Sequence, residues 1–183
     1  MIILMLPGPR PTRSHLAVAS FVVLVAFAGF QAVALIPDDW IPTHTLGTGD
    51  QLEPLSALHG AIPLTLRLEQ LPTCSFVIFS SPDCSHCQRR APGWDAEFGE
   101  PGTAILLSVS AWDETAAFAT EYGPKTIPTF AAAEQADVIG LGVLGVPTIV
   151  ATGPNGAVAA VASGGNYSAD SLRLAAGCVR ADQ

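Results

Sequence analysis

The sequence predicts a single α/β domain built around a mixed β-sheet, preceded by an N-terminal apolar segment. Short apolar runs typical of buried strands alternate with helical patterns between residues 61 and 138. Two further strand-like runs flank a turn at residues 154–156, which predicts antiparallel pairing, and a last helical segment follows them. The length of 183 residues suits one domain with an appendage.

A long apolar run occupies residues 16–36. Of its 21 residues 18 are hydrophobic, enough for a helix to span the hydrocarbon core of a bilayer. Arg10 and Arg13 precede the run and every acidic residue follows it, so the rest of the chain is expected outside the cytoplasm. Two alternatives stay open: a retained transmembrane anchor, or a signal peptide cleaved after Ala34, which ends a small-x-small tripeptide. Both place the remainder in a compartment where disulfides persist.

The charge of the chain excludes one class of partner. With 16 acidic and 8 basic residues, the formal net charge is −8. Such a chain repels phosphate backbones, so nucleic acid is not an expected partner. Composition divides the chain into a targeting segment at residues 1–36, a Pro- and Gly-rich linker or lead-in at 37–60, and the α/β domain at 61–183.

The first elements of the domain are predicted from polarity and proline positions. Residues 61–68 alternate weakly and contain Pro63, which lacks an N–H group, so they are predicted as an edge strand. Residues 75–80 form a short continuous apolar run, which predicts a buried central strand. A helix is expected over 84–98, interrupted at Pro92 because proline removes a helical hydrogen bond.

The later elements are predicted on the same grounds. Ser168 suits the N-cap of the last helix, and Gly177 suits its end. Before that helix, the sequence predicts a strand at 103–110, a helix at 113–122, a short strand at 126–130, a helical segment at 131–138 and hairpin strands at 148–152 and 157–162.

The motif that carries chemistry is Cys84-Ser85-His86-Cys87, at the expected start of a helix and directly after the central strand. Unpaired N–H groups of a first helical turn stabilise a thiolate at Cys84, which makes it the candidate nucleophile. Cys87 lies one turn later on the same face, close enough to form a disulfide with Cys84 or to resolve a mixed disulfide. His86 can add a positive charge or a hydrogen bond to the thiolate.

Two stretches of the chain resemble the thioredoxin superfamily. FVIFSSPDCSHCQRRAP is similar to the thioredoxin active-site segment, including a proline five residues after the second cysteine. Val146-Pro147-Thr148, followed by strand, turn, strand, glycine and helix, resembles the family's second signature, in which a cis-proline faces the C-x-x-C pair. Pro128 also lies in an I-P-T sequence but lacks that sequel. The long interval between the motifs, together with the apolar segment, is similar to TlpA-like, redoxin-type membrane-anchored thiol–disulfide oxidoreductases.

The resemblance implies a thioredoxin-like fold and an oxidoreductase that exchanges disulfides with proteins. Cys84 would attack, Cys87 would resolve, and His86 and Pro147 would complete the catalytic site. The Val146 backbone, with Thr148 beside it, would pair with an extended substrate segment. No organic cofactor is implied, because the Cys84–Cys87 dithiol is itself the redox centre. Expected partners are protein thiols and disulfides, an unidentified redox partner, and the membrane through the apolar run.

Three questions stay open. Asp83 replaces the tryptophan that thioredoxins place before the first cysteine, and Ile78 occupies the position of their buried aspartate, so the direction of electron flow is undetermined. The alternative function is a thioredoxin-fold copper-binding or metallochaperone module, because the two thiols with His86 suit the soft copper(I) ion. Cys74 and Cys178 either form a structural disulfide or remain unpaired.

Overall fold

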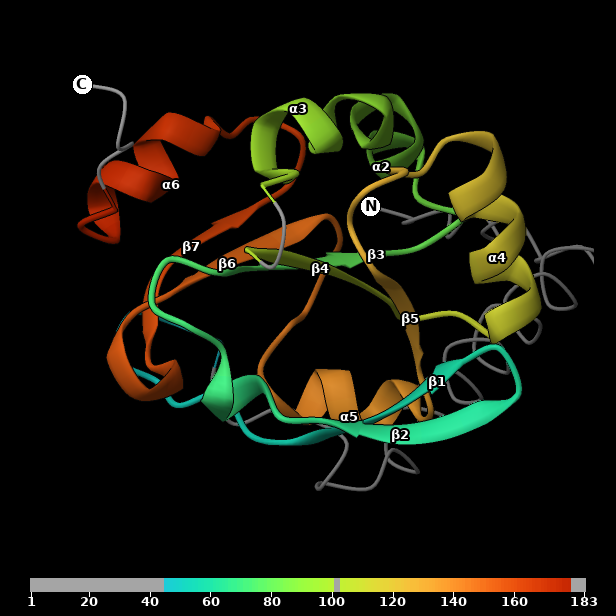
Figure 1. The fold of residues 1–183 in the computed structure, drawn as a ribbon, viewed down its shortest axis with the longest axis horizontal. Helices are drawn as coiled ribbons and strands as arrows, with labels where there is room; N and C mark the ends of the chain where they lie inside the picture. The colour runs from blue at the N-terminus through green and yellow to red at the C-terminus, as the bar shows by residue number, and fades with distance from the viewer. Residues whose placement is uncertain (1–44, 101–102, 179–183) are drawn as a thin grey trace, which may run out of the picture. The chain divides into compact units, whose positions relative to one another are not determined.

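The computed structural model describes residues 45–100 and 103–178 (Figure 1). The apolar run at residues 16–36, with its alternatives of anchor and signal peptide, lies outside these residues. Within the described ranges, no helix combines the length and the apolar character needed to cross a membrane.

A seven-stranded mixed sheet forms the centre of the domain, in the order β2-β1-β5-β4-β3-β6-β7. Neighbours β3 and β4 are parallel, as are β4 and β5, whereas every other neighbouring pair is antiparallel. The predicted central strand, β3, is buried at all five residues, and the predicted edge strand, β2, lies at one end of the sheet. The strands are β1 (Leu55–His59), β2 (Ile62–Leu66), β3 (Phe76–Ser80), β4 (Ala104–Ser108), β5 (Thr129–Ala132), β6 (Thr148–Thr152) and β7 (Val158–Ser163).

Helices cover both faces of this sheet. In Figure 1, α2, α3, α4 and α6 lie on one side of the sheet and α5 lies on the other. Apolar side chains of the first four helices pack on one face, and those of α5 and the η2 turn pack on the other. The helices are α2 (Ser85–Arg90), α3 (Trp94–Phe98), α4 (Trp112–Glu121), α5 (Gln135–Gly140) and α6 (Ala169–Ala175), with 3₁₀ turns η2 (Leu68–Gln70), η3 (Ala91–Gly93) and η4 (Pro154–Gly156).

Proline and capping signals predicted the helix boundaries well. The helix expected over 84–98 is divided by η3, which contains Pro92. Ser168 is the N-cap of α6, where its hydroxyl accepts a hydrogen bond from the Ser171 N–H group. Gly177 follows this helix with φ +70°, a conformation that glycine adopts without steric cost.

β1 was not predicted from the sequence, and it lies inside the segment predicted as a lead-in. Leu55 and Ala57 of β1 are buried while Ser56 is exposed, but a five-residue alternation is a weak signal by itself. Leu46 and Leu52 are also buried, and they belong to the same apolar cluster as β1. The folded core therefore includes part of the segment 37–60 rather than starting at residue 61.

The segment before β1 also runs along the outer edge of β7. Gly49 donates its N–H to the Val158 carbonyl at 2.8 Å, and the Val158 N–H donates to the Asp50 carbonyl at 2.8 Å. Gln51 extends this contact through an antiparallel bridge to Ala157. One terminal strand of the sheet is thereby hydrogen-bonded along part of its length.

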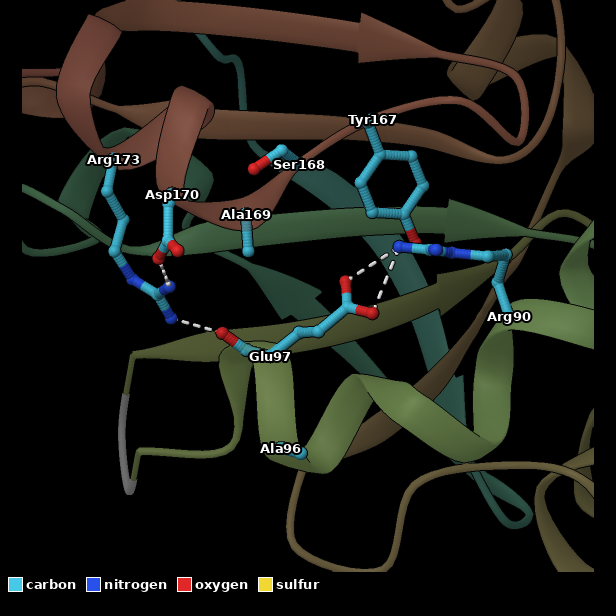
Figure 2. A pocket seen from close by; sticks show the side chains of 8 residues that line it. All are labelled: Arg90, Ala96, Glu97, Tyr167, Ser168, Ala169, Asp170 and Arg173. Carbon is cyan, nitrogen blue, oxygen red and sulfur yellow. Dashed lines mark hydrogen bonds and ion pairs between the residues drawn. The ribbon is translucent and has the colours of Figure 1, made fainter.

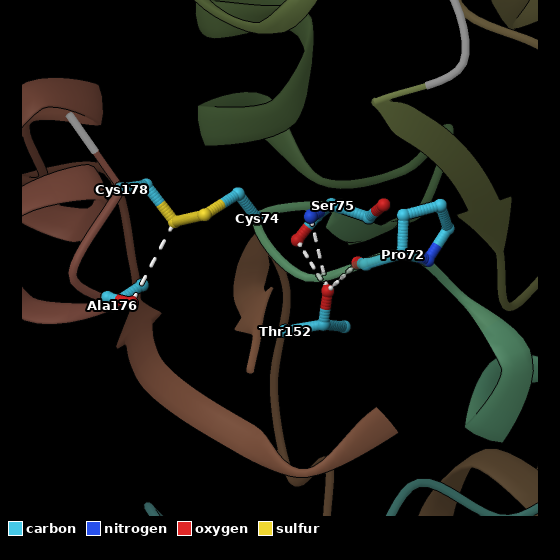
Figure 3. Close-up of a disulfide and its surroundings, with 6 residues drawn as sticks. All are labelled: Pro72, Cys74, Ser75, Thr152, Ala176 and Cys178. Carbon is cyan, nitrogen blue, oxygen red and sulfur yellow. Dashed lines mark hydrogen bonds between the residues drawn. A yellow bond between two sulfur atoms is a disulfide. The ribbon is translucent and has the colours of Figure 1, made fainter. Parts of the chain in front are cut away.

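Cys74 and Cys178 form a disulfide, which resolves the alternative that the sequence left open (Figure 3). It joins the residues before β3 to the residues after α6, with the two Cα atoms 5.6 Å apart. Nearby, the buried Thr152 hydroxyl donates to the Pro72 carbonyl at 2.8 Å and accepts from the Ser75 N–H at 3.0 Å. This corner of the domain is therefore held by both covalent and hydrogen bonds.

Candidate active site

Cys84 occupies the N-cap position of α2, at the end of the loop that leaves the central strand. Its Sγ accepts a hydrogen bond from the Cys87 N–H at 3.1 Å, so the sulfur replaces the side-chain oxygen that usually caps a helix. On its other side the thiol lies 3.4 Å from the Val146 carbonyl oxygen. Cys84 is half-buried and unbonded to Cys87, which corresponds to the reduced pair.

Cys87 lies behind Cys84 and has no exposed surface. It packs in the apolar cluster that includes Ile78, Ala91 and Trp94. Burial, reinforced by the adjacent Cys84 thiol, raises the pKa of Cys87 to about 12. Cys87 is therefore a neutral thiol at physiological pH. The two cysteines differ in access to solvent, because Cys84 is half-buried and Cys87 is fully buried, as an attacking and a resolving thiol should.

This difference predicts selective alkylation of the reduced protein. Since Cys87 is buried and its pKa is raised to about 12, iodoacetamide should modify Cys84 and spare Cys87 between about pH 7 and 9. Peptide mapping by mass spectrometry measures the two sites separately. Cys87 should react only after denaturation, and equal labelling of both cysteines in the native protein would contradict the assignment of roles.

The peptide bond between Val146 and Pro147 is cis, in the position that the resemblance predicted. Val146 is half-buried and its carbonyl is the group that faces Cys84. Thr148 is buried, and its hydroxyl donates to the Gly145 carbonyl at 2.6 Å and lies 2.8 Å from Ser163 Oγ. Thr148 therefore stabilises the loop at Gly145 through its hydroxyl. The Val146 backbone is the part of this motif that lies beside the Cys84 thiol.

His86 is exposed and turned along α2, where its Nδ1 lies 3.0 Å from an Arg89 guanidinium nitrogen. Its ring packs closely against the backbone of Gly165. A Cβ atom added to that glycine would lie only 2.7 Å from Nδ1. Nδ1, one of the two ring nitrogens that could bind copper, is thus directed at a cation. In residues 45–100 and 103–178, no three His, Cys, Asp or Glu side chains converge as a metal site would require.

Sequence reasoning missed Tyr167, which joins the active-site helices to the loop before α6 (Figure 2). The Trp94 indole N–H donates to its hydroxyl, and the Arg90 guanidinium lies 4.3 Å above its ring. Arg90 also reaches both carboxylate oxygens of Glu97, at 2.9 and 3.0 Å. Trp94 is fully buried, and no local pattern marks a tyrosine far along the chain as its partner.

Ile78 occupies the position at which thioredoxins carry a buried aspartate, and it lies in the apolar core. Two residues along the strand, the Ser80 hydroxyl is fully buried and makes no hydrogen bond within the described residues. No carboxylate therefore stands at this position of the sheet to accept the proton of Cys87.

The strand order, the helices on both faces and a C-x-x-C pair at a helix start opposite a cis-proline define a thioredoxin-like fold. Many solved structures share it. A thio-disulfide isomerase from Thermus thermophilus is 20% identical, with a TM-score of 0.56 over 73% of this chain and 99% of that one. DsbF of Mycobacterium tuberculosis is 21% identical, with a TM-score of 0.53 over 68% and 92%.

A secreted disulfide oxidoreductase of Mycobacterium tuberculosis is more distant in sequence. It is 13% identical, with a TM-score of 0.51 over 68% of this chain and 93% of that one. No protein-family model and no curated protein matches the sequence. The similarity to these thiol–disulfide oxidoreductases establishes the fold class, and the chemistry of this chain has to be argued from its own site.

Proposed function

We propose that this protein is an exported, membrane-tethered thiol–disulfide oxidoreductase that exchanges disulfides with protein substrates through Cys84 and Cys87. The observation that carries the proposal is the asymmetry of the pair. The Cys84 sulfur is half-buried and caps a helix, while Cys87 is fully buried with its pKa raised to about 12. Such a pair provides one thiol for the substrate and a second that reacts only with the first.

In the reducing direction, the Cys84 thiolate attacks one sulfur of a substrate disulfide. The substrate S–S bond breaks, a mixed disulfide forms at Cys84, and the other substrate sulfur leaves as a thiolate that takes up a proton. Cys87 then loses its proton and attacks the Cys84 sulfur, which releases the second substrate thiol. Two electrons pass to the substrate and the Cys84–Cys87 disulfide remains; the oxidising direction is the reverse.

The Val146 carbonyl supports a place for the substrate chain. It lies 3.4 Å from the Cys84 sulfur, and the following residue, Pro147, has no N–H group. An extended segment that presents a cysteine to Cys84 would therefore run beside this backbone and pair with Val146. This part of the proposal needs only backbone complementarity, so it fits substrates of varied sequence.

Export and tethering are proposed from two features. The apolar run at residues 16–36 is long enough for a membrane anchor and follows Arg10 and Arg13, which favours a C-terminal domain outside the cytoplasm. The Cys74–Cys178 disulfide is the kind of bond that persists in an oxidising compartment.

The proposal is tested with the full chain in detergent, assayed both for reduction of insulin disulfides and for oxidative refolding of a reduced protein. We expect activity in at least one direction, and the reduction potential of the Cys84–Cys87 pair shows which one dominates. Absence of both activities would disprove the enzymatic function. Protease protection of the domain in sealed inverted membrane vesicles tests the export, since a cytoplasmic domain would be digested there.

A further inference from the structure

Arg89 differs from the other basic side chains of the described residues in what it contacts. Arg67, Arg90 and Arg173 form ion pairs with carboxylates, and Lys125 donates to two backbone carbonyls. The Arg89 guanidinium instead contacts an imidazole, Nδ1 of His86. Within residues 45–100 and 103–178, no carboxylate neutralises it, although the chain carries a net charge of −8.

The contact with His86 orients the Arg89 guanidinium beside the active site. Because a guanidinium can only donate hydrogen bonds, Nδ1 of His86 is the acceptor in this contact. The ring packs against Gly165, and the adjacent Gly164 donates its N–H to the Pro147 carbonyl at 2.8 Å. The exposed pair of His86 and Arg89 thus adjoins the loop that borders the cis-proline, where a substrate would pass Cys84.

We propose that Arg89, oriented by His86, recognises a carboxylate beside the disulfide of a polypeptide substrate; this inference rests on the proposed function. The guanidinium retains unpaired N–H groups in the planar fork that matches a carboxylate. Asp83, the exposed residue directly before Cys84, repels an acidic side chain of the substrate on its own side of the cysteine. Favoured substrates therefore carry Asp or Glu on the side of the substrate cysteine that faces α2.

The test compares peptides in which one cysteine forms a mixed disulfide with thionitrobenzoate and is flanked by Glu, Gln or Lys. Reduction oxidises Cys84 and Cys87 to their disulfide and releases the peptide thiol and the coloured thiol, whose absorbance gives the second-order rate constant of a single turnover. The reduced full-length protein should prefer Glu over Gln about two- to fivefold, as expected for an exposed ion pair, and should disfavour Lys. The preference should disappear in about 1 M salt.

Arg89→Gln should remove the preference for Glu, and the matched control Arg67→Gln should retain it, because Arg67 is already paired with Glu69. Equal rates for the Glu and Gln peptides in the unmodified protein would overturn the proposal, as would a preference that survives Arg89→Gln. An Arg89 effect seen with glutathione disulfide but not with the peptides would overturn a polypeptide as the source of the carboxylate. Failure of the Gln peptide to react at all would instead disprove the proposed function.

Discussion

Replacing Cys84 with serine is expected to abolish disulfide exchange, with a loss of at least about a thousandfold in rate. The hydroxyl of serine does not form the covalent intermediate, because it is neither appreciably ionised nor able to exchange with a disulfide. The substitution should leave the fold intact, since serine is among the preferred N-cap residues and its oxygen can accept the Cys87 N–H hydrogen bond now made by sulfur. The initial rate of insulin reduction measures the loss.

Ser85→Ala is the matched control, because Ser85 is exposed on the same turn and carries no proposed chemistry. It should retain nearly full activity, and the unfolding free energy of both variants should lie within about 0.5 kcal/mol of the parent. Cys87→Ser should behave differently from Cys84→Ser, because the first attack still occurs and the mixed disulfide then accumulates. Residual turnover of more than a few per cent in Cys84→Ser would remove Cys84 from its assigned role.

Removing the disulfide between Cys74 and Cys178 is expected to give the largest loss of stability. The bond closes a loop of 104 residues, for which the chain-entropy estimate is about 4–5 kcal/mol. That value approaches the whole stability of many single domains, about 5–15 kcal/mol. Urea unfolding of Cys74→Ala/Cys178→Ala should show the loss, while exchange activity persists under conditions where the variant is folded.

A second variant separates the cross-link from the conformation of Cys74. Cys74 has φ +71°, in the left-handed region that is unfavourable for residues with a Cβ atom. Cys74→Gly/Cys178→Ala should therefore be about 1 kcal/mol more stable than the Ala/Ala variant, although still well below the parent. Equal stability of parent and both variants would show that the cross-link does not stabilise the domain.

Local signals were sufficient for most of the fold. The continuous apolar run before Cys84, the interruption at Pro92 and the cap at Ser168 each act within a few residues, and the structure confirms all three. β5 lies at Thr129–Ala132 rather than at 126–130, because pairing with β4 sets its register: the Leu106 N–H donates to the Pro128 carbonyl at 2.9 Å. Contacts of this kind join distant parts of the chain and leave no local pattern.

The same distinction applies to the candidate site. The C-x-x-C spacing identified the cysteine pair, and the resemblance to thioredoxins pointed to Pro147, whose peptide bond is cis. The partners of the surrounding side chains were not predictable, because Tyr167 reaches Trp94 from 73 residues away in the sequence. His86 was expected to act on the Cys84 thiolate, whereas the hydrogen bond of its Nδ1 goes to Arg89.

The hydrogen bonds between the segment before β1 and the rim of β7 have a consequence for the behaviour of the protein in solution. A terminal strand with unpaired N–H and C=O groups is a template for pairing with another copy, and so for aggregation. Gly49, Asp50 and Gln51 occupy part of that template on β7. A truncated protein that began at β1 would lack this cover, so the residues from Leu46 onward protect the domain from self-association as well as completing its core.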